Sequence, residues 1–196
     1  MAISITKQQL KKTPIIDYEK IRPFLKTGDI FFSSGSYAFS GIIQKLTKSV
    51  WSHVAVIYKD EELGRVLVLE AEPSVGIRLI PLSKYLQDYN GKKRPYKGQV
   101  VVAQINSEIP KDHLKKGICF GLDELTRPYD NYEIVRIMMR ILFKVSRRER
   151  NRNYICSELV RDIFAKAGIV MHYKDTYISP NNIWTDNRVE MKYRIL

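Results

Sequence analysis

The stretch that decides the fold is residues 52–71, which read SHVAVIYKDEELGRVLVLEA. Two runs rich in valine, leucine and isoleucine, 52–58 and 65–71, flank the charged segment 59–64, which ends in glycine. This pattern is typical of a β-hairpin, in which a polar turn joins two antiparallel strands. The sequence therefore predicts a hairpin here, and the rest of the chain can be placed around it.

The register of the hairpin can be predicted because facing residues of an antiparallel pair have position numbers with a constant sum. A turn centred between Glu61 and Glu62 makes this sum 123, so that His53 faces Glu70 on one side of the sheet. Directly opposed Cβ atoms lie about 4.5–5.5 Å apart, which lets a carboxylate accept a hydrogen bond from an imidazole. We therefore predict a histidine base with an orienting acid. The alternatives are a structural pair, or a one-residue slip that separates the two side chains.

Further elements are predicted from hydrophobic periodicity and from turn residues. Strands grouped in the first half and helices in the second favour an α+β architecture, and the length of the chain suits one domain, 1–196. The predicted strands are 30–33, 75–80 and 98–105, and the predicted helices are about 39–46, 114–125, 134–145 and 156–167, the last ended by Gly168.

Composition and charge limit the partners that fit the chain. A formal net charge of +12 attracts acidic partners and anionic membrane surfaces over long range. Nucleic acid is not expected, because the densest basic cluster, 147–152, has no interleaved aromatic residue that could stack on bases. The charged N-terminus lacks the apolar core of a secretory signal, and two cysteines are too few for a disulfide framework, so we expect a cytoplasmic protein.

Cys156 is the candidate nucleophile because of its place at the start of a predicted helix. The unpaired N–H groups of a first helical turn and the positive end of the helix dipole stabilise a thiolate there. The same N–H groups can bind a developing oxyanion. The sequence thus predicts an activated thiol at the entry to the helix 156–167.

The other cysteine and the other histidines are assigned no chemistry. Cys119 lies between Gly117 and Gly121, a spacing that predicts close helix packing, and we expect a small buried apolar residue there. His113 and His172 have polar neighbours and are expected at the surface. No metal is expected, because the close ligand spacing of a zinc site is missing.

Several short motifs follow one another in a fixed order over about two thirds of the chain. They are Gly28-Asp29-Ile30, Ser52-His53-Val54-Ala55-Val56, Glu70-Ala71, Pro128-Tyr129-Asp130 and Tyr154-Ile155-Cys156-Ser157-Glu158-Leu159-Val160. In this order the chain resembles the permuted papain-like amidases, the YaeF- and YiiX-like proteins of the NlpC-type cysteine peptidase superfamily. The histidine and the acid precede the cysteine, as expected for the permuted branch.

This resemblance implies a fold, a catalytic set and a substrate site. The implied fold is α+β and circularly permuted papain-like, with an antiparallel sheet or partial barrel flanked by helices. Cys156 would be the nucleophile, His53 its base and Glu70 the group that orients the histidine. No cofactor is needed. The candidate substrate-binding residues, which all lie in the motifs, are Tyr154, Ser52, Asp29 and Tyr129.

The expected function is hydrolysis of an amide in a small peptide-like or cell-wall-derived substrate through an acyl-enzyme. One alternative is a lipid ester or thioester hydrolase, or an acyltransferase, that works at an anionic membrane surface with the same three residues. Exposure of the apolar segment 134–145 would favour that alternative, and its burial would favour the amidase. A second alternative is a basic binding module without turnover.

Overall fold

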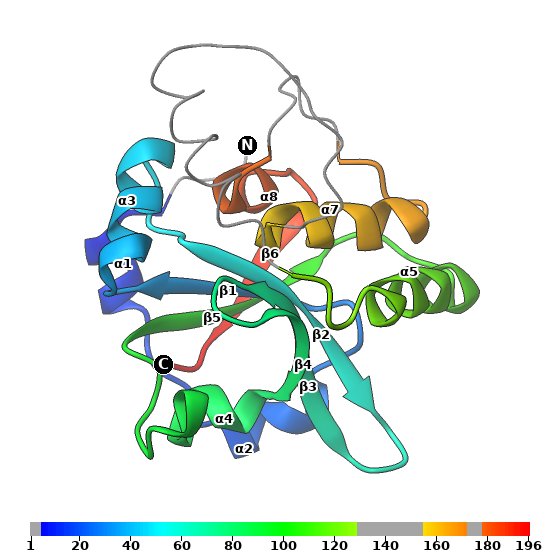
Figure 1. The fold of residues 1–196 in the computed structure, drawn as a ribbon, viewed down its shortest axis with the longest axis horizontal. Helices are drawn as coiled ribbons and strands as arrows, with labels where there is room; N and C mark the ends of the chain where they lie inside the picture. Colours follow the sequence, from blue (N-terminus) through cyan, green and yellow to red (C-terminus); the bar gives the residue numbers. More distant parts are fainter. Residues whose placement is uncertain (1–4, 129–154, 172–177) are drawn as a thin grey trace.

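The structure is a computed structural model that describes residues 5–128, 155–171 and 178–196. Its centre is a six-stranded sheet in the order β4-β3-β2-β1-β5-β6, in which all neighbouring strands are antiparallel (Figure 1). The strands are β1 (Ile30–Gly35), β2 (His53–Asp60), β3 (Arg65–Glu72), β4 (Gly76–Pro81), β5 (Gly98–Ile105) and β6 (Val189–Arg194).

Helices cover both faces of this sheet. Helices α5, α7 and α8 lie on one face, and α2 and α4 lie on the other (Figure 1). The helices are α1 (Lys7–Lys12), α2 (Tyr18–Ile21), α3 (Ala38–Thr47), α4 (Leu82–Gln87), α5 (Lys111–Asp123), α7 (Cys156–Lys166) and α8 (Pro180–Trp184), with short 3₁₀ turns η1 (Arg22–Phe24) and η2 (Tyr89–Gly91).

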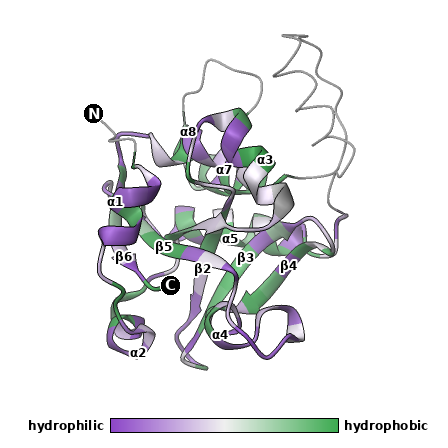
Figure 2. Cartoon of the chain, turned by 90° about the vertical axis from the view of Figure 1, so that its left-hand side faces the viewer, coloured by the Kyte–Doolittle hydropathy of each residue, from purple (hydrophilic) through white to green (hydrophobic). Residues whose placement is uncertain are grey.

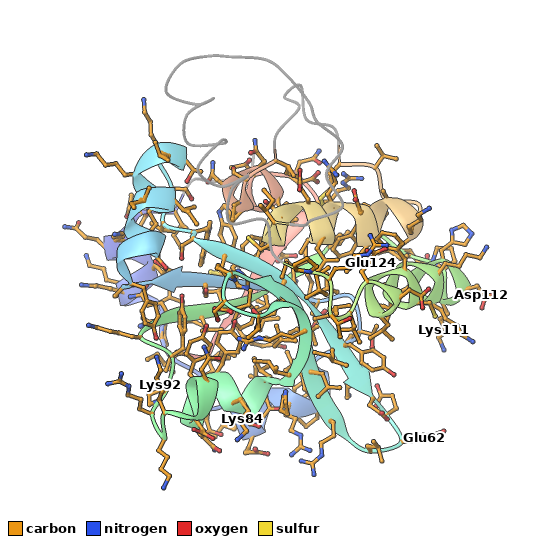
Figure 3. The ribbon with its side chains drawn as sticks, viewed as in Figure 1. Glu62, Lys84, Lys92, Lys111, Asp112 and Glu124 are labelled. Carbon is orange, nitrogen blue, oxygen red and sulfur yellow. The ribbon has the colours of Figure 1, made fainter. Side chains whose placement is uncertain are left out.

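The alternation of side chains along each strand divides the core into two layers. On β1, Ile30 and Phe32 pack with the residues of α5, α7 and α8, whereas Phe31 packs with Leu82 and Tyr85 of α4. Figure 2 shows hydrophobic residues along the strands and hydrophilic ones along the outer helix α1. Charged side chains such as Glu62 and Asp112 lie at the periphery (Figure 3). Both faces of the sheet are therefore buried.

The structure confirms the α+β architecture, the antiparallel sheet and most of the predicted elements. The predicted strand 98–105 coincides with β5, and the predicted helix 156–167 is α7, ended by Gly168 at φ +83°. Strand β6 and the short helices α1, α2, α4 and α8 were not predicted. The predicted helix 134–145 and the basic cluster 147–152 lie outside the described residues. Within the described part of the chain, no helix has the length and apolar character that crossing a bilayer requires.

The hairpin formed by β2 and β3 has a different register from the predicted one. Ile57 faces Val68, so the sum of facing positions is 125 and not 123. The turn has four residues, 61–64, because Asp60 Oδ1 accepts a hydrogen bond from the Leu63 N–H at 2.9 Å and Gly64 adopts a left-handed φ of +59°. A shift of two positions leaves every side chain on its predicted face.

Helices α5 and α7 pack closely through two glycines of α5, as predicted. A Cβ atom at Gly117 would lie 2.4 Å from the Ile163 carbonyl oxygen, and one at Gly121 would lie 2.8 Å from the Ile163 side chain. The prediction that Cys119 is buried is wrong, because this residue is exposed. The helix turns its glycine face toward α7, and successive residues are separated by about 100° around a helix, so Cys119 points away.

Candidate active site

His53 and Glu70 are hydrogen-bonded, although they are not facing residues of the hairpin. The distance between His53 Nε2 and Glu70 Oε2 is 2.6 Å. The ladder between β2 and β3 joins only 56–60 to 65–69. Beyond it, β2 continues beside β1 as far as His53, and β3 continues beside β4 as far as Glu72. The two strands therefore separate at this end, and the imidazole reaches diagonally across the opening to the carboxylate.

Glu70 is fully buried and has two further hydrogen-bond donors. Tyr85 Oη donates to Oε2 at 2.5 Å, and Arg78 Nε donates to Oε1 at 2.8 Å. Burial raises the pKa of Glu70, but the hydrogen bonds and charges of His53, Arg78 and Tyr85 outweigh it, so the net pKa is lowered. The carboxylate is thus ionised at neutral pH, and its orientation is fixed from three directions.

Cys156 is the first residue of α7 and lies close enough to His53 to raise the pKa of the imidazole. Helix α7 packs on β2 and β3 from the face opposite α4 (Figure 1), and the opening between these strands brings His53 within hydrogen-bonding reach of the thiol. Because Nε2 is bonded to Glu70, the nitrogen that remains for Cys156 is Nδ1. The three predicted catalytic residues therefore form one chain of contacts.

The protonation of His53 follows from this arrangement. Burial lowers the pKa of His53, but its hydrogen bonds to Cys156 and Glu70 and the charges of both partners raise it to about 10. At neutral pH the ring is accordingly an imidazolium, with Nε2–H directed at Glu70 and Nδ1 left on the other side of the ring. An imidazolium beside a cysteine is the arrangement found at nucleophilic thiols.

The start of α7 supplies backbone donors beside the sulfur. The first N–H groups of a helix have no intrahelical acceptors, and Ile155, the residue before α7, provides no side-chain cap. The Glu158 N–H already donates to the Ile155 carbonyl at 3.1 Å, so the donors in question are the N–H groups of Cys156 and Ser157. Ser157 Oγ donates to the Ile178 carbonyl at 2.7 Å, which ties the helix start to the segment before α8. The N–H groups near Cys156 can therefore stabilise negative charge on an oxygen bound next to the sulfur.

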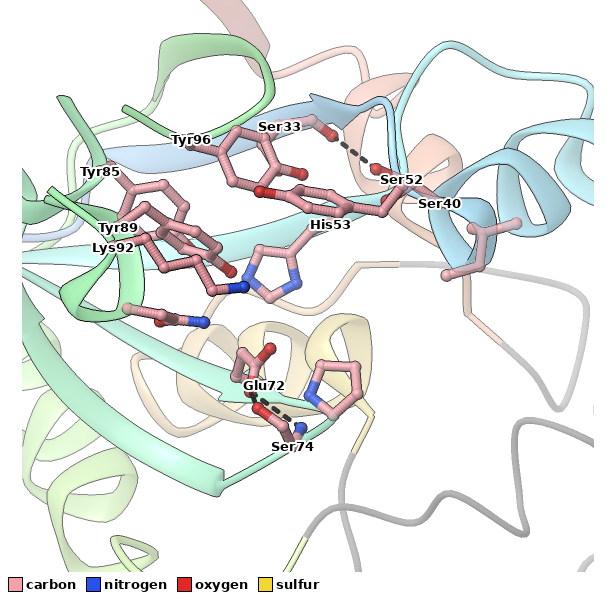
Figure 4. A pocket seen from close by; sticks show the side chains of 14 residues that line it. Ser33, Ser40, Ser52, His53, Glu72, Ser74, Tyr85, Tyr89, Lys92 and Tyr96 are labelled. Atoms are coloured by element: carbon pink, nitrogen blue, oxygen red, sulfur yellow. Dashed lines mark hydrogen bonds between the residues drawn. The ribbon is translucent and has the colours of Figure 1, made fainter. Parts of the chain in front are cut away.

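A pocket with a volume of about 310 Å³ opens beside His53 (Figure 4). This volume lies at the lower end of the range for small-molecule sites, roughly 300–1,000 Å³. The described residues that line it are Ser33, Tyr37, Ser40, Ile43, Ser52, His53, Glu72, Pro73, Ser74, Tyr85, Tyr89, Asn90, Lys92 and Tyr96.

Of the four candidate substrate-binding residues, the structure describes Ser52 and Asp29. Ser52 lines the pocket, and its Oγ accepts from the Gly35 N–H at 3.0 Å. Asp29 is separated from His53: its carbonyl accepts from the Ile57 N–H, four residues along β2 from His53, or about 13 Å at 3.3 Å per residue. It does not line the pocket. Tyr154 and Tyr129 lie outside the described residues.

Arg78 and Tyr85, the partners of Glu70, were not identified from the sequence. Arg78 faces Glu70 directly in the hairpin of β3 and β4, where the sum of facing positions is 148. A hairpin centred on Ser74 has this sum, so the sequence did contain a signal for Arg78. No comparable signal exists for Tyr85, which reaches Glu70 from α4 across the tertiary structure.

A model of the permuted papain-like amidase enzymes, YaeF/YiiX, C92 family, matches residues 24–191. The chain belongs to this family. Among solved structures, this C92 family protein is similar to one from Escherichia coli O157:H7 described as the metalloprotein yiiX. The two share 18% sequence identity with a TM-score of 0.63, over 86% of this chain and 97% of the other. No curated protein sequence gives a significant match.

These comparisons confirm the predicted family and the permuted papain-like fold, here with an open sheet. They also support a general hydrolase or amidase role for the C92 family protein. The relative from Escherichia coli is described as a metalloprotein, but in residues 5–128, 155–171 and 178–196 no group of three or more His, Cys, Asp or Glu side chains could hold a metal ion. The burial or exposure of the segment 134–145 would decide between the amidase and the lipid alternative, but this segment lies outside the described residues.

Proposed function

We propose that the protein is a cysteine amidase in which Cys156 is the nucleophile, His53 the proton-transfer group and Glu70 the orienting acid. The observation that carries this proposal is the position of His53, which interacts with Cys156 and donates Nε2–H to the buried Glu70 at 2.6 Å. A base held between a nucleophile and an orienting group is the signature of nucleophilic catalysis. The match to an amidase family supports the choice of an amide as the bond that is cleaved.

The first half of the proposed reaction forms an acyl-enzyme. The Cys156 thiolate attacks the amide carbonyl carbon, and the negative charge that develops on the oxygen is stabilised by N–H groups at the start of α7. The imidazolium of His53 then gives its Nδ1 proton to the amide nitrogen, the C–N bond breaks, and the amine leaves. The acyl group remains on Cys156 as a thioester.

The second half releases the acyl group to water. Neutral His53 accepts a proton from a water molecule, which attacks the thioester carbonyl. The C–S bond breaks, a carboxylic acid leaves, and the thiolate and imidazolium are restored. Glu70 keeps the imidazole in one orientation through both halves, because Tyr85 and Arg78 prevent the carboxylate from turning.

Acyl transfer to Cys156 can be tested before any natural substrate is known. With p-nitrophenyl acetate, we expect release of nitrophenolate together with an acetyl group on Cys156, located by mass spectrometry of peptides. The reaction should be lost in Cys156→Ala and reduced at least about a hundredfold in His53→Ala, the usual contribution of a general acid-base group. The exposed Cys119, removed by Cys119→Ala, is the matched control for non-specific acylation.

The proposal would be contradicted if Cys156 were acetylated no faster than Cys119, or equally fast with and without His53. If Cys156 is instead acetylated and acetate is then released, the next step is to compare the rates at which amides and long-chain esters are hydrolysed. Faster turnover of the esters would move the protein to the lipid alternative.

A further inference from the structure

The pocket beside His53 has few aliphatic side chains for a site that would hold an acyl chain. Of its described lining residues, only Ile43 and Pro73 are aliphatic. The aromatic lining residues other than His53 are all tyrosines, and burial raises the pKa of Tyr89 and Tyr96, so that their hydroxyl groups are uncharged at neutral pH. Ser33 Oγ donates to Tyr96 Oη at 3.2 Å. Rings and hydroxyl groups of this kind suit a ligand that forms hydrogen bonds.

Glu72 supplies a carboxylate that is already oriented. It lies two residues from Glu70 on β3, so its side chain is on the same face of the sheet as Glu70 and His53. Its Oε2 accepts hydrogen bonds from the N–H of Ser74, at 2.8 Å, and from the Ser74 hydroxyl. Among the described residues, Oε1 has no hydrogen-bond partner. This oxygen is available to a ligand in the pocket, where Glu72 is half-buried.

Lys92 supplies the opposite charge from a different element. Its loop is held in place because Asp88 Oδ1 accepts from the Lys93 N–H at 2.8 Å and Asn90 Oδ1 accepts from Arg78 Nη1 at 2.9 Å. Figure 4 shows Lys92 and Glu72 approaching the pocket from different sides, with His53 between the elements that carry them. In the described part of the chain, the Lys92 ammonium forms no ion pair. Apart from His53, these are the two charged residues among the described lining.

We infer that the pocket binds a zwitterionic amino-acid or short-peptide group, whose ammonium pairs with Glu72 and whose carboxylate pairs with Lys92. The inference rests on the proposed function and deepens it, because His53 lines this pocket and a ligand held in it lies beside the imidazole. The tyrosine rings favour the same ligand, since an aromatic face attracts an ammonium group. A lipid chain would instead offer no partner to Glu72 Oε1 or to the Lys92 ammonium.

The inference can be tested by binding alone, with Cys156→Ala protein that cannot turn over. Alanine, dialanine and trialanine are the probes, because they carry the same two charges at increasing separation. Isothermal titration should show that the best of these binds about tenfold more tightly than its N-acetylated form, and about three- to fivefold more tightly than its C-terminal amide. The smaller factor for the amide reflects the exposure of Lys92.

Two variants assign these preferences to residues. In Glu72→Gln, N-acetylation of the probe should no longer weaken binding, whereas C-terminal amidation should still weaken it. In Lys92→Met, amidation should no longer weaken binding, whereas N-acetylation should. Glu62→Gln at the tip of the β2–β3 hairpin (Figure 3) and Lys93→Met beside Lys92 are the matched controls. Neither residue lines the pocket. Both controls should bind the probes like the parent protein.

The inference is overturned if no zwitterionic probe binds better than its blocked forms, if the preferences survive in Glu72→Gln and Lys92→Met, or if decanoate binds better than all three probes. These outcomes are independent of the acetylation experiment on Cys156. A reactive Cys156 with no preference for zwitterions would remove this inference and keep the cysteine amidase. A preference for zwitterions with an inert Cys156 would do the opposite.

Discussion

At Glu70, three donors meet on one buried carboxylate, and each has a separate role. His53 receives its orientation from the carboxylate, Arg78 balances the negative charge, and Tyr85 shares the oxygen that His53 uses. A buried carboxylate without partners would be protonated and could not stabilise an imidazolium. The ionised state of Glu70 therefore depends on residues from α4 and β4, outside the motifs that mark the family.

Tyr85→Phe removes one of these donors without changing the shape of the side chain. A hydrogen bond to a charged acceptor contributes about 1.5–3 kcal/mol, so we expect the free energy of unfolding, measured with urea, to fall by about that amount. Alkylation of Cys156 should also slow, because Glu70 then holds His53 less firmly. Tyr89→Phe is the control, since Tyr89 packs against the Tyr85 ring at 4.9 Å. Equal stability and reactivity of both variants would show that Tyr85 has no role at Glu70.

Asp29 provides a prediction on pH. Burial raises its pKa to about 6, although hydrogen bonds from Lys26 and Gln104 oppose the shift. Because the folded pKa is above the unfolded one, the contribution of Asp29 to stability is fully present below about pH 4 and is lost as the pH rises through 6. Relative to the parent protein, Asp29→Asn should therefore gain up to about 3 kcal/mol of unfolding free energy between pH 4 and pH 7. A difference that stays constant over this range would contradict the assignment.

Among the elements, α7 matters most because its first residue is Cys156, and its position depends on the glycine face of α5. Gly117→Ala would place a Cβ atom 2.4 Å from a backbone oxygen of α7, which must push the helices apart. We expect a loss of about 1–3 kcal/mol in unfolding free energy and slower alkylation of Cys156. Gly41→Ala in α3 is the control, because nothing lies within 4 Å of its Cβ position, and it should stabilise the protein by about 0.5–1 kcal/mol. Similar results for both substitutions would exclude the close packing.

The hairpin shows what the sequence could and could not predict about this site. The two-residue period placed His53 and Glu70 on the correct face, and this survives any shift by an even number of positions. The register itself depends on the four-residue turn with Gly64. The opening between β2 and β3 arises because the end of β2 pairs with β1 and the end of β3 pairs with β4. These tertiary contacts, and the hydrogen bond from Tyr85 of α4 to Glu70, leave no local sequence pattern from which they could be predicted.

Over the whole molecule, Arg194 near the C-terminus joins the two ends of the chain. Its Nη1 donates to the carbonyl groups of Leu10, Lys11 and Thr13 at 2.8–2.9 Å, which are the last carbonyls around α1. This contact holds α1 against the core, where Leu10 is fully buried. The guanidinium thereby stabilises the end of the helix by satisfying otherwise unpaired acceptors.

Arg194→Met should loosen this connection while leaving the site intact. We expect a loss of about 2–4 kcal/mol in unfolding free energy, since three carbonyl acceptors, one buried and two partly buried, lose a charged donor. Hydrogen exchange should accelerate in α1, and the alkylation rate of folded Cys156 should not change. Lys192→Met, which removes only an exposed pair with Glu190, is the control. Unchanged exchange in α1 would show that the N-terminal helix is held by other contacts.

The most direct test of the account is the rate at which iodoacetamide alkylates Cys156 as the pH is varied, in Cys119→Ala protein with and without His53→Ala. An imidazolium beside the thiol predicts that Cys156 still reacts at about pH 6, at least about tenfold faster than in the His53 variant. A thiol that reacts only at alkaline pH, equally fast in both proteins, would contradict the pairing of Cys156 with His53 and with it the proposed amidase.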